Sequence, residues 1–342
     1  MYRPPPDFQQ CIYTPHRVSA VVAELVAQGA PAALALAGTG LDASQLESPA
    51  TRVSYRQIET VFRNGLRLSN DPMFVIRAAQ RMHVTAYGMY GYAILSSRTS
   101  LEAIDFGAKY HRVVGPVADI AYERDGETVV YVYEPSLWLD PTDELYRVAV
   151  EFVMASHLTV LQDLHGKTFE TVRARLAYAA PPHGRRYRAM LGCPVTFGQG
   201  RNELHFDAVW LDRPMPLADP VTHAFAHELC DQLLGELDRG AGVASQVRRA
   251  LFHNPGRFPT IEAMAGELSM PAWALRRRLA GEGTSYRQLL EEIRKRLALE
   301  YLRKTQLTNE EISSRLGYSD GANFRHAFVR WTGKSPSEFR GA

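Results

Sequence analysis

Cysteines and long apolar runs are scarce in this sequence of 342 residues. The three cysteines, Cys11, Cys193 and Cys230, are far apart and odd in number, which suits a reducing compartment and matches no metal-ligand spacing. No apolar run approaches the roughly 18 residues that a membrane-spanning helix needs. The first residues, MYRPPPDFQQ, lack the apolar core of a signal peptide. We therefore expect a cytoplasmic protein without a membrane segment.

Sequence motifs of catalysis are absent as well. The chain contains no G-x-S-x-G nucleophile turn and no G-x-x-x-x-G-K-[ST] phosphate loop. His223 and His227 are four residues apart, as metal ligands on one helix face are, yet H-E-x-x-H is missing and no third ligand is evident. We predict that the protein is not an enzyme and has no catalytic residue, no cofactor and no metal.

Charge is divided unevenly along the chain, although the formal net charge is only +2. Residues 243–342 contain 17 Lys and Arg against 10 Asp and Glu, a net +7, which leaves 22 against 27, a net −5, for residues 1–242. A basic segment beside an acidic one is expected when one binds phosphates and the other does not. A solvated basic surface is the alternative interpretation.

Residues 1–240 have the pattern of an α+β domain. Apolar residues at helical spacing predict helices after Pro15, after Ser54 and across 143–164. Strands are expected at 117–124 and 127–133 around the two-residue turn Asp125-Gly126, and at 172–178, 194–197 and 203–209. The Gly- and Tyr-rich segment 85–97 is a turn or a strand beside a cavity. Helices and strands alternate too irregularly for a doubly wound sheet.

Aromatic side chains of this domain are candidates for a small-molecule site. Such sites are mostly apolar cavities with a few polar groups. Aromatic residues in a domain of this size are more often core than pocket, so both interpretations stay open. The candidates for contact with an unknown small-molecule effector are Tyr87, Tyr90, Tyr92, Tyr110, His111 and Trp138.

A helix across 219–239 is expected to close this domain. Its apolar residues, among them Val221, Phe225 and Leu233, face either the core or a second copy of the chain in a homodimer. We favour the core, because no heptad pattern is sustained over several turns. Arg-Gly-Ala-Gly at 239–242 predicts a flexible joint. The domain boundary is therefore placed between residues 1–240 and 243–342.

The last hundred residues repeat one pattern twice. TIEAMAGEL at 260–268 and TNEEISSRL at 308–316 both start with Thr and are offset by 48 residues. The apolar residues of the helix that follows each segment match at an offset of 49. The repeat predicts two helix-turn-helix units, at about 258–281 and 308–333, in an all-α domain. A long helix at 285–304 joins them, and its basic residues, such as Arg294 and Lys295, either contact phosphates or are solvated.

The second unit has the clearest boundaries. Thr308 and Glu311 form a capping box at the start of its first helix. Gly317 and Tyr318 make the turn, and Ser319 is the expected cap of the second helix. Apolar residues of that helix, among them Phe324, lie on one face, which leaves polar side chains for the major groove of DNA.

These features resemble the DNA-binding domain of the AraC/XylS family of bacterial transcription regulators. The similarity covers about residues 243–340, and LGYSDGANFRHAFVRWTGKSPSEFR keeps the family's aromatic residue after the turn Gly, its FxxAF core and its TGxSPxxFR ending. Two segments are similar to recurring sequence motifs of the subgroup with an amino-terminal arabinose-binding-like effector domain: GYAILSSRTSLEAIDFGAKYHRVV and LGCPVTFG. The resemblance implies two recognition helices in successive major grooves, about 34 Å apart, and contact with RNA polymerase.

Individual DNA contacts are implied for both recognition helices. Arginine can pair with guanine bidentately, and an indole can contact a thymine methyl or a sugar. Ser269 replaces the usual turn Gly of the first unit, and Pro271 stands where a capping Ser is common. The second unit is expected to position the protein while the first discriminates sequence. The expected DNA-binding residues are Trp273, Arg276 and Arg277 in the first unit and Asn323, Arg325, His326 and Lys334 in the second.

The sequence thus predicts a sequence-specific, DNA-binding transcription regulator, an effector-responsive activator on double-stranded DNA. The alternative is a small-molecule-binding or scaffolding module whose helical carboxyl-terminal domain docks a protein partner. The tandem repeat and the basic charge of residues 243–342 favour the regulator.

Overall fold

The structure, a computed structural model, describes residues 8–48, 50–166, 169–240, 242–253, 258–305 and 307–340. The chain divides into two compact units, residues 1–237 and 238–342, which are treated separately below. Among the described residues, no helix is both long and apolar enough to cross a membrane.

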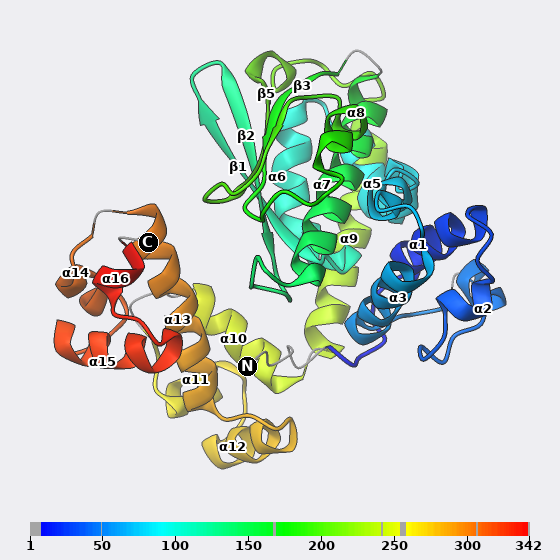
Figure 1. Ribbon diagram of the computed structural model, residues 1–342. Helices are drawn as coiled ribbons and strands as arrows, with labels where there is room; N and C mark the ends of the chain where they lie inside the picture. Colours follow the sequence, from blue (N-terminus) through cyan, green and yellow to red (C-terminus); the bar gives the residue numbers. More distant parts are fainter. Residues whose placement is uncertain are drawn as a thin grey trace. The chain divides into compact units, whose positions relative to one another are not determined.

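A five-stranded sheet with the order β1-β2-β5-β3-β4 forms one layer of the first unit (Figure 1). All neighbouring strands are antiparallel except the parallel pair β3 and β4. Asp125 pairs with Thr128, so the hairpin turn consists of Gly126, with φ +58°, and Glu127, one residue later than predicted. The strands are β1 (Ala118–Asp125), β2 (Thr128–Pro135), β3 (Thr171–Arg175), β4 (Val195–Thr196) and β5 (Asn202–Asp207).

Helices supply the rest of the first unit. The longest, α7 (Glu144–His165), is buried along most of its length and packs against β2, α3 and α4. Asp143 caps it by accepting a hydrogen bond from the Leu145 N–H at 2.8 Å. The others are α1 (His16–Ala27), α2 (Ala32–Ala35), α3 (Tyr55–Leu68), α4 (Phe74–Ala79), α5 (Gly88–Leu95), α6 (Ser100–Tyr110), α8 (Tyr187–Leu191) and α9 (Pro220–Gly240).

The segment 85–97 is helical, so the prediction of a turn or strand was wrong. A 3-10 turn at Val84–Tyr87 leads into α5, and Gly88 makes the junction with φ +55°. Gly91 follows inside the helix, where a Cβ atom would collide with the carbonyl oxygen of Val84. Close packing of α5 on the preceding turn therefore explains glycines that look like strand or turn signals in the sequence.

The apolar stripe predicted to face the core on α9 faces outward instead. Val221 is 79% exposed, Phe225 59% and Leu233 37%, whereas the buried side of the helix carries Ala226 and Cys230. The helix also extends through Arg239 and Gly240, so the first half of the predicted joint is helical. Ala241, the remaining non-glycine of that predicted joint, lies outside the described residues.

The second unit is all helical (Figure 1). Thr260, Ser285 and Thr308 accept capping hydrogen bonds at the starts of α11 (Ile261–Glu267), α13 (Tyr286–Lys304) and α14 (Asn309–Arg315). The α10 helix, which the sequence pattern did not reveal, packs against α12 and α13. The helices are α10 (Val243–His253), α11 (Ile261–Glu267), α12 (Ala272–Gly281), α13 (Tyr286–Lys304), α14 (Asn309–Arg315), α15 (Gly321–Thr332) and α16 (Pro336–Arg340).

A long-range cap explains why α10 was missed. The Glu282 carboxylate, just beyond the end of α12, accepts hydrogen bonds from the N–H groups of Val243 (2.7 Å) and Ala244 (2.9 Å). A Cβ atom on Gly242 would meet that carboxylate. The acceptor lies about 40 residues from the helix start, beyond the reach of a local capping pattern.

Candidate nucleic-acid interface and ligand cavity

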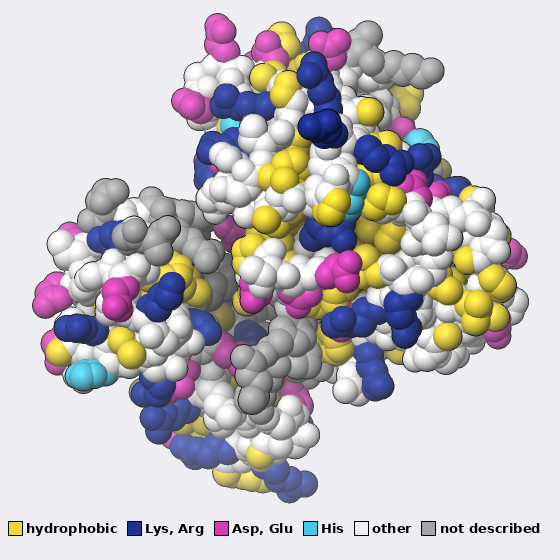
Figure 2. Space-filling view, viewed as in Figure 1, with side chains coloured by type: hydrophobic (Ala, Val, Ile, Leu, Met, Phe, Trp, Pro, Cys, Tyr) yellow, Lys and Arg dark blue, Asp and Glu magenta, His cyan; other side chains and the backbone are white. Residues whose placement is uncertain are grey.

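In the first helix-turn-helix unit, α11 and α12, four long side chains of α12 are exposed to solvent. Leu275 and Leu279 are fully buried and fix the inner face of α12. Trp273, which is 64% exposed, and the exposed Arg276, Arg277 and Arg278 lie on the other faces of the helix. Figure 2 shows dark blue Lys and Arg side chains gathered over the α12 region. The helix offers guanidinium and indole groups at its surface.

Arg276 and Arg277 differ in what they contact. The Arg276 Nη2 lies 2.8 Å from the Glu262 Oε1 of α11, and both side chains are more than half exposed. The pKa of Glu262 is held below its ordinary value by the backbone N–H of Glu262 and then by Arg276. Arg277 makes no ion pair with any carboxylate of the described residues. Exposed ion pairs stabilise little, so a phosphate or a base can replace Glu262 as the partner of Arg276.

The second unit, α14 and α15, uses some of its polar side chains for capping. Asp320, rather than the predicted Ser319, caps α15, and its Oδ1 accepts from the Asn323 N–H at 2.7 Å. That N–H is the main reason why the pKa of Asp320 is lowered. The Asn323 Nδ2 donates to the Ser319 Oγ at 2.8 Å and to the Asp320 Oδ2 at 2.9 Å. Both amide N–H groups of the exposed Asn323 are thus used in hydrogen bonds within the chain.

Fewer long side chains project from the start of α15 than from α12. Gly321 is buried, and the carboxylate of Glu310 occupies the place of a Cβ atom there. Ala322 follows and has no polar group. Arg325 and His326 are exposed one turn later.

Basic residues around the end of α15 differ in their contacts. Lys334 is exposed after the helix. Arg330 forms an ion pair with Glu291 at 3.0 Å, and the Lys295 Nζ donates to the Trp331 carbonyl oxygen at 3.1 Å. Lys295 therefore caps a helix carboxyl terminus, where a cation is favoured.

Arg294 of α13 connects the two helix-turn-helix units. Its guanidinium lies 5.3 Å from the ring centre of Phe258, before α11, and 4.6 Å from that of Tyr318, between α14 and α15. It also donates to the Gly317 carbonyl oxygen at 3.0 Å. These contacts with both units give Arg294 a structural role.

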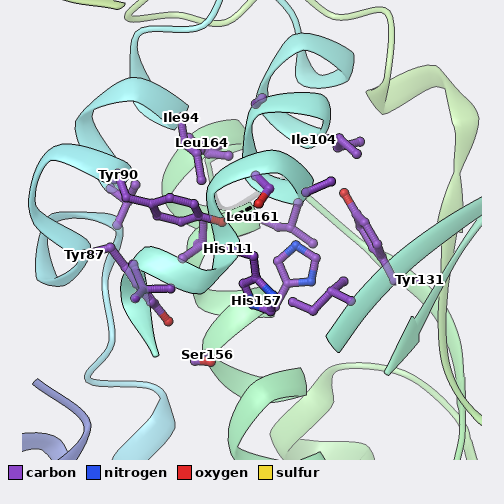
Figure 3. Close-up of a pocket in the computed structure, with 18 of the residues that line it drawn as sticks. Tyr87, Tyr90, Ile94, Ile104, His111, Tyr131, Ser156, His157, Leu161 and Leu164 are labelled. Atoms are coloured by element: carbon purple, nitrogen blue, oxygen red, sulfur yellow. Dashed lines mark hydrogen bonds between the residues drawn. The ribbon is translucent and has the colours of Figure 1, made fainter. Parts of the chain in front are cut away.

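A cavity of about 140 Å³ lies in the amino-terminal part of the chain, residues 1–237, between α5, α6, α7 and the β1-β2 hairpin. Tyr87 and Tyr90 stand on one side of it in the view of Figure 3, and Tyr131 on the other, with His111 and His157 between them. Apolar side chains fill most of the remaining wall, among them Ile94, Ala103, Ile104, Val114, Val153, Val160, Leu161 and Leu164. The shape and lining are those of a small-molecule site.

Three of the six aromatic candidates from the sequence do not line this cavity. Trp138 is only 3% exposed and packs edge-on against Phe62 in the main core. Tyr110 is fully buried, and its hydroxyl contacts the His227 Nε2 at 3.1 Å and the Asp231 Oδ1 at 2.5 Å of α9. Tyr92 is 47% exposed on the surface. The packing of the helices decides which aromatic side chains face the cavity, and the residue type alone does not predict this.

Polar groups on the cavity wall include several that the sequence interpretation missed. Arg17 of α1 is buried and lines the cavity, as do Ser156 and His157 of α7. A signal was available for Arg17, because it lies four and eight residues before the buried Val21 and Leu25. A charged residue on an otherwise apolar helix stripe is unusual and points to a specific role.

Burial lowers the pKa of the three histidines that line the cavity, His111, His157 and His165. Loss of solvent, together with the charge of Arg17, lowers the pKa of His111 to about 3. Burial and then His111 lower the pKa of His157 to about 3. The Tyr133 hydroxyl lies 2.9 Å from the His157 Nδ1. Neutral imidazoles can both donate and accept hydrogen bonds. Among the described residues, no group of three or more His, Cys, Asp or Glu could hold a metal ion.

Comparison with known proteins matches both units. Residues 29–215 match the family described as the arabinose-binding domain of AraC transcription regulator, N-term, and residues 264–342 match a helix-turn-helix domain family. The chain is 38% identical over 302 residues to the ornithine utilization regulator of Pseudomonas aeruginosa, which covers 87% of each protein. It is 32% identical over 338 residues to an uncharacterized HTH-type transcriptional regulator of Mycobacterium tuberculosis, 98% of this chain and 97% of that protein. The crystal structure of transcriptional regulator CdpR from Pseudomonas aeruginosa is 24% identical, covers 95% of this chain and 97% of its own, and has a TM-score of 0.46.

These matches confirm the resemblance and the fold class predicted from the sequence, and they favour a regulator over the protein-docking alternative. The relatives are transcription regulators, not enzymes. The chain belongs to the AraC family of helix-turn-helix transcription regulators, with an amino-terminal effector-binding domain and a carboxyl-terminal DNA-binding domain.

Proposed function

We propose that residues 243–342 read two successive major grooves of double-stranded DNA, with α12 as the main reader of bases and α15 as the positioning helix. Trp273, Arg276 and Arg277 would contact bases. Arg325, His326 and Lys334 would contact the second groove or its phosphates, and Asn323 would contribute its remaining acceptor oxygen. The observation that supports this division is a contrast between the two recognition helices. The α12 helix exposes long side chains, whereas α15 begins with Gly321 and Ala322.

Selection of bound sites from a random duplex library tests this division. The double variant Arg276→Ala plus Arg277→Ala is expected to lose at least tenfold in affinity and its preference at guanine positions, because a bidentate contact contributes about 1–3 kcal/mol of discrimination. Arg287→Ala is the matched control, since Arg287 is exposed on α13 and, among the described residues, forms an ion pair with Glu291 of the same helix alone. Unchanged affinity and base preference in the double variant would contradict the role of α12.

Salt titration examines the DNA contact without knowledge of the operator. Neutralised phosphates release counterions, so affinity should fall steeply as salt rises. A DNA affinity that does not change with salt would count against DNA binding through the basic residues 243–342. Lys334→Ala should weaken binding about equally on all sequences and make the slope shallower.

We propose that the cavity of residues 1–240 is the effector site and that its ligand changes the affinity of the regulator for DNA. A ligand shifts such an equilibrium only if it binds the two states with different affinities. Tyr87, Tyr90 and His111 would contact the ligand. The family resemblance supports a cytoplasmic activator that contacts RNA polymerase. Transcription from a selected site in a reporter, with purified polymerase, should rise when regulator and ligand are both present.

A homodimer is proposed through the exposed stripe of α9. Val221, Phe225, Leu229 and Leu233 are spaced four residues apart, and three of them rank among the exposed large apolar residues. Such stripes on helices mark association surfaces. Analytical ultracentrifugation should show a dimer for the native chain and a monomer for Val221→Asp plus Phe225→Asp. Leu139→Asp, at another exposed leucine, should leave the dimer intact.

A further inference from the structure

One buried cation on the cavity wall lacks an acidic partner. Arg17 is only 7% exposed, and its Nη1 donates to the carbonyl oxygens of Gly115, at 2.5 Å, and Val114. Its Nε is buried and donates to no described group. Arg17 forms no ion pair with a carboxylate of residues 8–48, 50–166, 169–240, 242–253, 258–305 or 307–340. The guanidinium of this cavity-lining residue therefore has at least one N–H group without a described acceptor.

Burial makes this arrangement costly without a further partner. A guanidinium stays protonated in proteins. An isolated buried charge is strongly disfavoured, and removal of its counter-charge leaves an uncompensated penalty. Two carbonyl dipoles compensate the charge only in part. Its field reaches the other cavity groups, since Arg17 acts on the pKa of His111, Tyr87 and Tyr90. An anion in the cavity would supply the missing charge.

Other wall residues fit an anion with an apolar body. The residues that line the cavity include no Asp or Glu. Burial lowers the pKa of all three lining histidines, His111, His157 and His165, so Arg17 is the one permanently charged residue among the described lining residues. Most other lining groups are aliphatic or aromatic. The cavity of about 140 Å³ is close to the roughly 150 Å³ apolar cavity that accommodates benzene.

We propose that the cavity binds a small monocarboxylate with an apolar body about the size of a benzene ring. The carboxylate pairs with the free N–H groups of Arg17, and the body packs among α5, α6 and α7. Planar guanidinium and carboxylate groups pair strongly and in a fixed geometry. A basic amino acid is excluded, because no lining carboxylate would receive its ammonium groups. This ligand class deepens the proposed effector role of the cavity and rests on it.

Isothermal titration calorimetry of the full chain tests the charge requirement. The probes are the sodium salts of benzoate, phenylacetate and hexanoate, the neutral analogue benzyl alcohol, and lysine. Benzoate should bind at least tenfold more tightly than benzyl alcohol, and lysine should not bind. Equal affinity for benzoate and benzyl alcohol, binding of lysine alone, or no binding by benzoate, phenylacetate and hexanoate up to millimolar concentration would each overturn the proposal.

Two variants locate the site. Arg17→Met removes the guanidinium and should abolish the preference for benzoate, while Arg63→Met, at an exposed arginine of α3, should not. Because Arg17 also anchors α1 to the Gly115 carbonyl oxygen, Ala103→Leu provides a second test that leaves Arg17 in place. It fills the cavity from α6 and should reduce benzoate affinity at least tenfold with the fold retained by circular dichroism. Benzoate affinity unchanged in Ala103→Leu would overturn the assignment to this cavity.

A parallel measurement separates the ligand class from the effector role. Fluorescence anisotropy follows the binding of the full chain to a selected duplex with and without benzoate. Benzoate that binds in an Ala103-dependent manner but leaves DNA affinity unchanged supports the ligand class and contradicts the effector role. A neutral compound that changes DNA affinity through the same cavity, with no binding of carboxylates, overturns the ligand class and leaves the effector role standing.

Discussion

The two helix-turn-helix units share an architecture but differ at the turn and at the cap of the recognition helix. In the first unit, the turn residue Ser269 has φ +54°, and Pro271 gives α12 no side-chain cap. In the second, Gly317 takes φ +68° without steric cost, and Asp320 caps α15. The local sequence therefore specifies the turn and the cap better in the second helix-turn-helix unit than in the first.

A polar side chain that caps a helix is not available for contact with DNA. Ser319, Asp320 and Asn323 stabilise the start of α15 through hydrogen bonds to one another and to the backbone. The start of α12 has no such network, and Trp273 and Arg277 remain unengaged by caps or described carboxylates. Local stability and freedom to contact bases are thus divided between the two units.

Core truncation should have the largest effect and should strike both units. Phe324 in α15 and its counterpart Leu275 in α12 are fully buried. Phe324→Ala should lower the free energy of unfolding by about 3–5 kcal/mol and Leu275→Ala by about 2–5 kcal/mol. Hydrogen exchange of peptides from the two units in the full chain measures where protection is lost. Loss confined to the truncated unit would show that the units unfold separately, and loss in both would show one cooperative domain.

Removal of Arg294 should loosen the connection between the units. Arg294→Ala deletes the contacts with Phe258 and Tyr318 and the hydrogen bond to the Gly317 carbonyl oxygen. Each cation–π contact contributes about 0.5–2 kcal/mol, so the loss should reach about 1–3 kcal/mol. Exchange should accelerate before α11 and in the α14-α15 turn together. Acceleration in one of these segments alone would contradict the connecting role.

Swapping the two turn residues, Ser269 and Gly317, by mutation should reverse the difference in backbone strain. Ser269→Gly should stabilise the first unit by about 1 kcal/mol, because glycine adopts a left-handed conformation without the penalty of a Cβ atom. Gly317→Ser should destabilise the second by a similar amount. Urea unfolding of the full chain gives both values. If Ser269→Gly were neutral, backbone strain would not distinguish the two turns.

Local sequence rules accounted for much of the second unit and less of the first. The Thr308-Glu311 box forms as the sequence pattern predicts, because it involves residues three apart. Asp320 displaced Ser319 as a cap because adjacent residues both offer an acceptor, and only the backbone geometry chooses between them. The cap of α10 by Glu282 depends on tertiary contact and leaves no local trace.

The effector cavity was harder to predict than the DNA-binding face. Exposed recognition residues follow from the inward position of Leu275 and Leu279, which periodicity shows. Cavity residues come from helices and strands far apart in sequence, so aromatic content could not separate Tyr90, on the wall, from Trp138, in the core. Arg17 was the informative residue, since its charge interrupts an apolar stripe of α1.

The smallest expected effect concerns the missing cap of α12. Pro271→Ser places a hydroxyl where Pro271 has an extended backbone with ψ 147°, so the new side chain can accept a hydrogen bond from an N–H of the first turn. The first unit should gain about 0.5–1 kcal/mol, less than a full capping contribution because proline restricts the unfolded chain. Slower exchange at the start of α12, with no change in α15, checks the gain. If base preference sharpened as well, the uncapped start of α12 would limit recognition in addition to stability; unchanged preference would confine the difference between the two caps to folding.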